Sequence, residues 1–258
     1  DALQIRGGRG YETADSLRRR GEVPIPIERA MRDLRINLIF EGSSEIMRLF
    51  IAREAVDHHF ETAFALVDKK AARKEKVAAA KRVAKFYPFW YPARWIGKGL
   101  FFGAYREFGR LAGHMRFIER NTRHLGRAIF HAMVRFGPKL ERKQMVLFRA
   151  VDIGAELFAM SAACVRAQML LKTDGNKQAV LLADTFCRLA RQRIAQSFDE
   201  LYGPDDDALY KAAKAVLEGK HTWLEHGIVS APAAAGDPAA GAERPSAHTI
   251  RREAAGVG

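Results

Sequence analysis

Apolar residues recur at helical spacing through the second half of the chain, which predicts three helices there. These helices span residues 144–171, 183–201 and, more briefly, 206–226. Their apolar positions are Met145, Phe148, Ala155, Phe158, Ala162, Val165 and Met169; Ala183, Phe186, Cys187, Ala190, Ile194, Phe198 and Leu201; and Leu209, Val216 and Trp223. The short link at Asp174 and Gly175 makes the first two helices antiparallel neighbours. The pattern therefore predicts an all-α fold.

The first sixty residues predict loops followed by one helix. Glycines at 7, 8 and 10 make a flexible turn, and prolines at 24 and 26 interrupt regular structure. A helix is predicted to begin at Ser43 or Ser44, whose hydroxyl can accept hydrogen bonds from free backbone amides. Its apolar positions are Ile46, Leu49, Phe50, Ala52, Val56 and Phe60.

The stretch between these regions changes composition twice. Residues 69–85 are rich in Ala, Lys and Arg, which predicts an exposed helix or a hinge at a domain boundary. Residues 86–102 mix aromatic residues with Pro88, Pro92 and glycines, so they should not form one regular helix. Two interpretations are open: Trp90, Trp95 and Phe101 contact a lipid interface, or they pack against the helical bundle.

Charge and composition narrow the class of protein. The chain has 43 Lys and Arg against 30 Asp and Glu, and its charge of +13 would attract nucleic acid, anionic lipid or CoA phosphates. Only two cysteines are present, which argues against a disulfide framework and favours a reducing, cytoplasmic compartment. No apolar run is long enough to span a membrane. The histidines lack the spacing of a helical metal pair, so no metal site is predicted.

Glu41 is a candidate general base. It follows the apolar pair Ile39 and Phe40 and precedes Gly42 and the predicted helix. In a dry pocket, desolvation would raise the pKa of its carboxyl toward that of a useful base. On composition alone, a solvated glutamate in a turn is the simpler interpretation.

Residues 4–53 resemble the closing motif of the acyl-CoA dehydrogenase family. The matching elements are Gln-Ile-x-Gly-Gly-x-Gly-Tyr from Gln4, Met31-Arg32-Asp33, Phe40-Glu41-Gly42-Ser43-Ser44-Glu45-Ile46 and Ile51-Ala52-Arg53. The resemblance implies an enzyme of fatty-acid β-oxidation in which Glu41 removes the α-proton of an acyl-CoA. The β-hydrogen leaves as hydride to FAD, which gives a trans-2-enoyl-CoA. Phe40 and Gly42 would border the substrate, and the N–H of Glu41 would donate to the thioester carbonyl.

The same resemblance implies a homo-oligomer, a dimer or a tetramer, that shares its cofactor between subunits. Gln4, Gly7 and Gly8 would contact the FAD of a neighbouring subunit, whereas Ser43 and Glu45 would contact the FAD that serves Glu41. Electron-transfer flavoprotein or a similar acceptor would reoxidise the flavin. Most of such an enzyme would lie upstream of Asp1, so we interpret the chain as a C-terminal fragment that is inactive alone.

Two features depart from the family's pattern. Arg6 and Arg9 place charge in the glycine loop, and residues 12–30 are longer than the usual link to Met31. Both features put the geometry of the loop in doubt.

Residues 140–228 resemble, more loosely, the extra C-terminal domain of very-long-chain acyl-CoA dehydrogenases, through the runs at 152–160 and 184–187. This implies long acyl substrates and peripheral contact with the inner face of a membrane, for which residues 86–102 are the candidate segment. Four parts are predicted: the end of the catalytic helical domain (1–68), a basic and aromatic linker (69–103), the appended helical domain (104–229) and a disordered tail (230–258). A rival hypothesis is a non-catalytic helical module that binds anionic lipid or another polyanion; nucleic acid is not a predicted partner.

Overall fold

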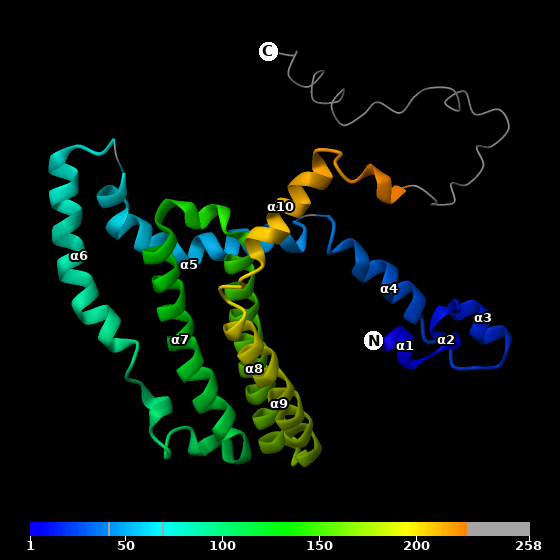
Figure 1. Ribbon diagram of the computed structural model, residues 1–258. Coiled ribbons are helices and arrows are strands. Elements are labelled where there is room, and N and C mark those ends of the chain that lie inside the picture. Colours follow the sequence, from blue (N-terminus) through cyan, green and yellow to red (C-terminus); the bar gives the residue numbers. More distant parts are fainter. Residues whose placement is uncertain (41, 69, 226–258) are drawn as a thin grey trace. The chain divides into compact units, whose positions relative to one another are not determined.

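The computed structural model describes residues 1–40, 42–68 and 70–225, and it confirms the all-α prediction (Figure 1). Every regular element in these ranges is an α-helix or a short 3₁₀ helix. Glu41 and the predicted tail at 230–258 lie outside the described residues. Residues 1–201 form one compact unit, and residues 202–258 belong to a second.

Three antiparallel helices form the core of the first unit. They are α7 (Ala112–Phe136), α8 (Gln144–Asp174) and α9 (Lys177–Asp199), and the 3₁₀ helices η2 (Arg106–Leu111) and η3 (Gly137–Arg142) flank α7. Gly175 ends α8 in the left-handed conformation, with φ of 65°, and the side chain of Asn176 then accepts from the N–H of Ala179 to begin α9. The two predicted long helices and their tight connection are therefore confirmed.

The buried face of α8 differs from the predicted one. The buried side chains of α8 are Val146, Ala150, Ile153, Leu157, Met160, Cys164 and Ala167. Phe158, Val165 and Met169, which were predicted to be apolar core, are exposed, and Phe158 is exposed by 75%. Because α8 carries apolar residues on both faces, its periodicity predicts a helix but does not identify the buried side.

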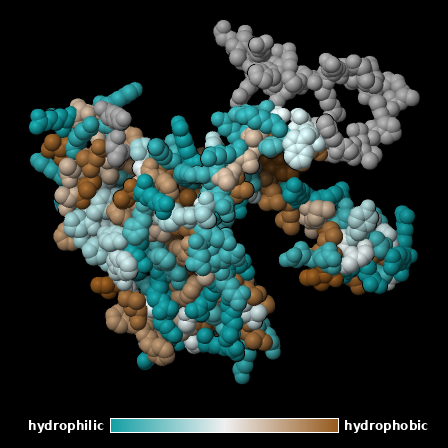
Figure 2. All heavy atoms as spheres, viewed as in Figure 1, coloured by the Kyte–Doolittle hydropathy of each residue, from teal (hydrophilic) through white to brown (hydrophobic). Residues whose placement is uncertain are grey.

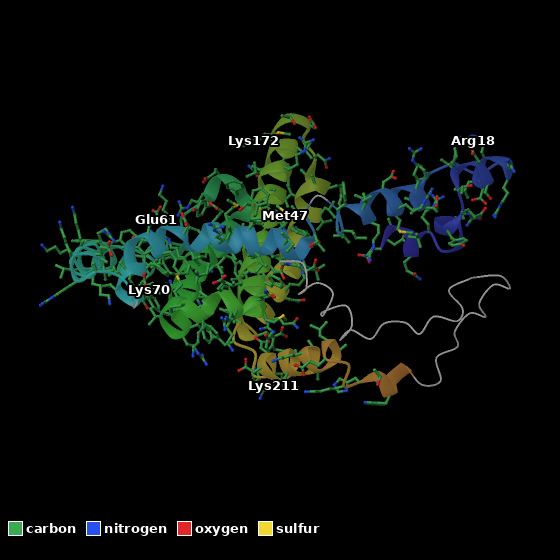
Figure 3. All side chains as sticks on the ribbon, turned by 90° about the horizontal axis from the view of Figure 1, so that it is seen from above. Arg18, Met47, Glu61, Lys70, Lys172 and Lys211 are labelled. Atoms are coloured by element: carbon green, nitrogen blue, oxygen red, sulfur yellow. The ribbon has the colours of Figure 1, made fainter. Side chains whose placement is uncertain are left out.

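Helix α5 (Ser44–Val67) begins after Ser43, as predicted, and crosses the bundle near the start of α8 (Figures 1 and 3). Arg48 donates from Nε to Asp152 of α8 over 2.8 Å. On the buried side of α5 lie Ala52, Val56, His59 and Thr62, while Phe50, which was also assigned to the apolar face, is exposed.

Residues 86–102 do not form one regular helix, as predicted, but α6 (Arg73–Ala93) extends further into this segment than its prolines would suggest. The helix continues through Pro88 and Pro92 and ends only at Ala93; the 3₁₀ helix η1 (Lys98–Leu100) follows. A proline inside a helix removes one backbone hydrogen bond, which costs about 3 kcal/mol. Side-chain packing opposes this cost, because Tyr87 and Trp90 contact the rings of His59 in α5 and Phe130 in α7.

The N-terminal residues form short helices where loops were predicted. These are α1 (Ala2–Ile5), α2 (Gly8–Tyr11), α3 (Ala14–Arg19) and α4 (Ile27–Ile36). The long link at 12–30 folds into α3, capped by Thr13, and a turn at Gly21. Helices α1, α2 and α4 contact one another, and Gly10 is required there because a Cβ would collide with the backbone of Leu3.

The described part of the second unit consists of α10 (Asp206–Leu217) and the 3₁₀ helix η4 (Thr222–Glu225). The predicted third helix is therefore shorter than expected. It ends before Gly219, which adopts the left-handed conformation with φ of 72°. Leu209, Val216 and Trp223, which were expected to be buried, are exposed.

Candidate functional site

The residues predicted to bind cofactor and substrate fall into two groups. Gln4 lies in α1, Gly7 precedes α2 and Gly8 is its first residue. Phe40, Gly42, Ser43 and Glu45 lie around the start of α5. Glu41, the predicted base, lies outside the described residues.

The glycine turn at residues 7 and 8 is open. Gly7 has φ of 55° and ψ of −137°, a conformation that favours glycine, and a Cβ added at Gly7 or Gly8 would meet no atom within 4 Å. A flat or anionic ligand could therefore approach this backbone closely.

The two departures from the family's pattern compensate each other in part. Arg9, which brings charge into the glycine loop, forms an ion pair with Glu22 of the long link. The pair raises the pKa of the Arg9 guanidinium and lowers that of the Glu22 carboxyl. Arg20 joins Glu12 and Glu22 over 2.7 and 2.8 Å. The long link thus supplies the carboxylate that pairs with Arg9, whereas the Nε of Arg6 is buried without a hydrogen-bond partner among the described residues.

The start of α5 explains the Gly-Ser pair of the motif. Gly42 has φ of 107°, and a Cβ there would lie 2.8 Å from the sulfur of Met47, so only glycine fits. Ser43 immediately precedes the helix, and its side chain makes no capping hydrogen bond. Its hydroxyl is therefore available beside the positive end of a 24-residue helix, a favourable place for a phosphate.

The apolar residues before Glu41 do not form a dry pocket by themselves. Residues 29–40 are all exposed, including Ile39 at 64% and Phe40 at 63%. The exposed large apolar side chains in this stretch are those of Met31, Leu34, Ile36, Leu38, Ile39 and Phe40. Exposure of this many apolar side chains in a short segment is typical of an interface. Desolvation of this region would require a further protein surface or a ligand.

In the aromatic segment, residues 86–102, one of the three side chains considered packs against the helical bundle and the other two are exposed. Trp90 packs against His59 and Phe130, whereas Trp95 and Phe101 are exposed. Four further apolar side chains that the sequence did not single out are also exposed: Phe89, Ile96, Leu100 and Phe102. Figure 2 shows hydrophobic atoms gathered at the lower left, where α6 ends and the chain leads to α7. No helix in the described ranges has the length and hydropathy needed to cross a membrane.

A buried charged cluster was missed by the sequence analysis. Asp184 of α9 is only 4% exposed, and its Oδ1 accepts from Nε2 of His114 in α7 over 2.9 Å. Its Oδ2 accepts from Arg110 over 3.1 Å and from Arg188 over 3.2 Å. The bond from His114 and the two arginines lower the pKa of the Asp184 carboxyl. The available signal was a charged residue on the apolar stripe of α9, between Ala183 and Cys187.

Cys164 and Cys187 also meet in this core, with their sulfurs 3.6 Å apart. The two thiols are free and fully buried. Across residues 1–40, 42–68 and 70–225, no three His, Cys, Asp or Glu side chains gather closely enough to hold a metal ion.

Two family models match the chain in the order expected from the sequence. Residues 1–56 match "Acyl-CoA dehydrogenase, C-terminal domain", and residues 109–222 match "ACAD9/ACADV, C-terminal domain". The helical fold, the α5 start motif and these matches define a C-terminal helical region of a dehydrogenase. The chain belongs to the acyl-CoA dehydrogenase family.

The relatives found by sequence carry the same description. The chain is 53% identical over 231 residues to the probable acyl-CoA dehydrogenase FadE10 of Mycobacterium tuberculosis and to that of Mycobacterium bovis, covering 89% of this chain and 36% of the relative. It is 25% identical over 201 residues to a probable acyl-CoA dehydrogenase of Bacillus subtilis, covering 75% and 28%. The chain thus spans about a third of the length of these relatives.

A solved structure also aligns with the chain. It is an acyl-CoA dehydrogenase complexed with FAD from Bacillus anthracis, with 24% sequence identity and a TM-score of 0.49. The alignment covers 82% of this chain and 32% of the solved one.

Proposed function

We propose that this chain is the C-terminal portion of an FAD-dependent acyl-CoA dehydrogenase that converts a long-chain acyl-CoA to the trans-2-enoyl-CoA in fatty-acid β-oxidation. The observation that carries the proposal is the family match over residues 1–56, which contains the motif around Glu41. The second match, over residues 109–222, supports the preference for long acyl chains. Residues 57–108, between the two matches, include the proposed linker at 69–103.

The described residues fit a flavin dinucleotide. Two features suit a phosphate-bearing, planar ligand: the open backbone at Gly7 and Gly8, and the Ser43 hydroxyl at a helix start, which makes no capping hydrogen bond. In the proposal, Gln4, Gly7 and Gly8 contact the FAD of a neighbouring subunit, and Ser43 and Glu45 contact the FAD beside Glu41. When bound, FAD supplies the hydride acceptor.

Glu41 and its neighbours would carry the proton transfer. The carboxylate of Glu41 accepts the α-proton, and its backbone N–H donates to the thioester oxygen as negative charge develops there. Phe40 and Gly42 border the substrate. The exposed apolar surface of residues 29–40 supports burial of this region against other protein, as an enzyme with subunits that share the cofactor would provide. In the proposal, electron-transfer flavoprotein or a similar acceptor reoxidises the flavin, and the protein is located in the cytoplasm.

The direct test is dehydrogenation by the complete protein. We expect purified full-length protein to contain FAD, to lose its oxidised flavin absorbance on addition of a long-chain acyl-CoA, and to reduce an electron-acceptor dye. The product should be two hydrogens lighter by mass spectrometry. The 258-residue chain alone serves as the control and should bind no FAD. A full-length protein that binds no flavin would favour the rival, non-catalytic module.

We also propose peripheral contact with a membrane, because exposed aromatic side chains in residues 89–102 lie among cations. The guanidinium of Arg127 lies 3.9 Å from the ring centre of Trp95, and that of Arg116 lies 5.1 Å from that of Phe102. Aromatic rings beside basic groups suit the boundary between lipid headgroups and acyl chains.

Liposome binding tests this contact. Replacing Trp95 and Phe102 by Ala should weaken co-sedimentation with anionic vesicles at least tenfold, since each buried aromatic side chain contributes about 1.5–3 kcal/mol. Binding should also weaken as salt is raised. Phe158→Ala is the control, because the exposed fraction of Phe158 lies between those of Trp95 and Phe102 but the residue lies on α8. Equal binding by wild type and the double variant would contradict a membrane role for this segment.

A further inference from the structure

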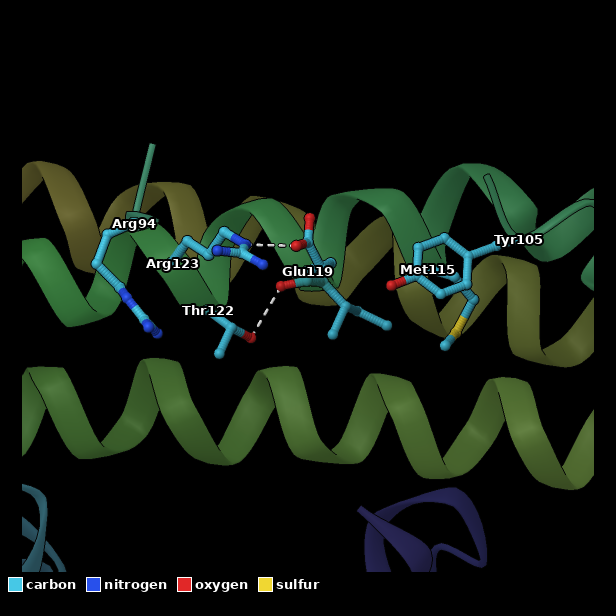
Figure 4. Close-up of a pocket in the computed structure, with 7 residues that line it drawn as sticks. Arg94, Tyr105, Met115, Glu119, Thr122 and Arg123 are labelled. Carbon is cyan, nitrogen blue, oxygen red and sulfur yellow. Dashed lines mark hydrogen bonds and ion pairs between the residues drawn. The ribbon is translucent and has the colours of Figure 1, made fainter. Parts of the chain in front are cut away.

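A groove runs along α7 beside the end of α6 (Figure 4). Its volume is about 330 Å³, within the range of sites that hold small molecules. The lining residues are Arg94, Tyr105, Met115, Ile118, Glu119, Thr122 and Arg123. From Met115 to Thr122 the helix rises about 10 Å, so the groove is elongated. None of the residues proposed for flavin or acyl-CoA contributes to it.

Arg94 supplies an unmet hydrogen-bond donor at one end of the groove. Its Nε is buried and has no partner among the described residues, and its guanidinium lies 5.3 Å from the ring centre of Trp90. The backbone is held independently, because Arg127 donates to the carbonyl of Arg94. A buried donor without an acceptor is costly, and an anionic oxygen is the strongest acceptor for a guanidinium.

The only carboxylate in the lining is already engaged. Glu119 forms an ion pair with Arg123 and accepts from the N–H of Gly99 over 2.8 Å. In Figure 4 this pair lies between Arg94 at one end and Tyr105 with Met115 at the other. The lining therefore holds two cations and one anion, and the uncompensated positive charge is that of Arg94.

The opposite end of the groove is apolar. Ile118 and Met115 come from α7, and Met115 packs against the hydrophobic core. Tyr105 adopts the left-handed conformation with φ of 64°, the one non-glycine residue to do so in the described part of the chain. Such strain is costly for a tyrosine and is typical of ligand-binding positions.

We propose that this groove binds a single-headed anionic amphiphile, either a fatty carboxylate or a monoalkyl phosphate. The anionic oxygens accept from the guanidinium of Arg94, and the alkyl chain lies over Ile118 and Met115 toward Tyr105. The ligand needs an anionic headgroup because Arg94 lies at one end of the groove, and it needs an alkyl chain because the other end is apolar. The site does not depend on the proposed dehydrogenase activity or on contact with a bilayer.

Isothermal titration calorimetry on the 258-residue chain tests the proposal. The probes are laurate and dodecyl phosphate, each below its critical micelle concentration. Inorganic phosphate represents the headgroup alone, and dodecanol represents the tail alone. We expect saturable binding of at least one amphiphile, and binding at least tenfold weaker for either part alone. The amphiphile that binds more tightly identifies the preferred headgroup.

Variants separate the site from general hydrophobic binding. Arg94→Gln should weaken amphiphile binding at least tenfold, while Arg94→Lys should retain part of the affinity. Lys98→Gln is the matched control, because it removes an exposed cation nearby and should have little effect. Circular dichroism verifies that each variant is folded. Equal affinity in Arg94→Gln and Lys98→Gln, no saturable binding of either amphiphile, or equally tight binding of dodecanol would overturn the proposal.

Discussion

Replacing Glu41 by Gln in the complete protein is expected to abolish turnover while FAD remains bound. The amide keeps the size of the side chain and cannot accept the α-proton, so the loss should be at least the factor of about 10²–10⁴ that a general base contributes. Flavin absorbance of the purified variant measures cofactor binding. Anaerobic mixing with a long-chain acyl-CoA, followed as bleaching of the oxidised flavin, measures the chemical step.

A second glutamate, on helix α5, controls for effects of charge. Glu54 is exposed on α5 and has no proposed role in catalysis or binding. Glu54→Gln should therefore reduce flavin at the wild-type rate. If Glu41→Gln also reduced its flavin at that rate, Glu41 would not be the base and the function assigned to the motif would be wrong.

The start of α5 could be predicted because local rules determine it. Ser43 lies directly before the helix and an apolar periodicity follows, although the expected capping hydrogen bond from its side chain is not formed. The resemblance to a family further identified Gly42, whose positive φ and close contact with Met47 are visible only in the structure. The pairing of Arg9 with Glu22 could not be predicted, because they are thirteen positions apart and their approach depends on the fold of the intervening link.

The buried faces were harder to predict than the helices. Helix α8 has apolar residues at Phe158 and Val165 as well as at Leu157 and Cys164, so the choice of face depends on where α7 and α9 lie. The continuation of α6 through Pro88 was not predicted, because it too depends on packing against other helices. The local preference of proline opposes a helix, and the packing of Tyr87 and Trp90 against other helices outweighs it.

Asp184 should contribute to stability, because its buried carboxylate joins the buried His114 and two arginines at the edge of the bundle. Its oxygens contact His114 of α7, Arg110 of η2 and Arg188 of its own helix. Removal of the carboxylate leaves the buried His114 without its partner, whereas the guanidinium groups of Arg110 and Arg188 are mostly exposed and can be hydrated. Asp184→Ala should therefore lower the free energy of unfolding by about 1–3 kcal/mol at neutral pH, as measured by urea denaturation.

The contribution of Asp184 should also depend on pH in a defined direction. Its partners lower the pKa of the carboxyl in the folded protein, whereas the unfolded value is about 3.9. The stabilisation is therefore complete above the unfolded pKa, and it is lost as pH falls through the lower, folded pKa. The stability difference between wild type and Asp184→Asn should accordingly be constant near neutral pH and shrink in acid.

An exposed aspartate on the same helix isolates the effect of burial. Asp199 lies at the end of α9, and Asp199→Ala should change the free energy of unfolding by no more than about 0.5 kcal/mol. The comparison distinguishes the cluster from a general effect of removing negative charge from a chain of net charge +13. Equal unfolding curves for Asp184→Ala and Asp199→Ala would mean that the cost of desolvating Asp184 and His114 cancels the attraction of the three partners for Asp184, and that the cluster does not stabilise the contact of α7 with α9.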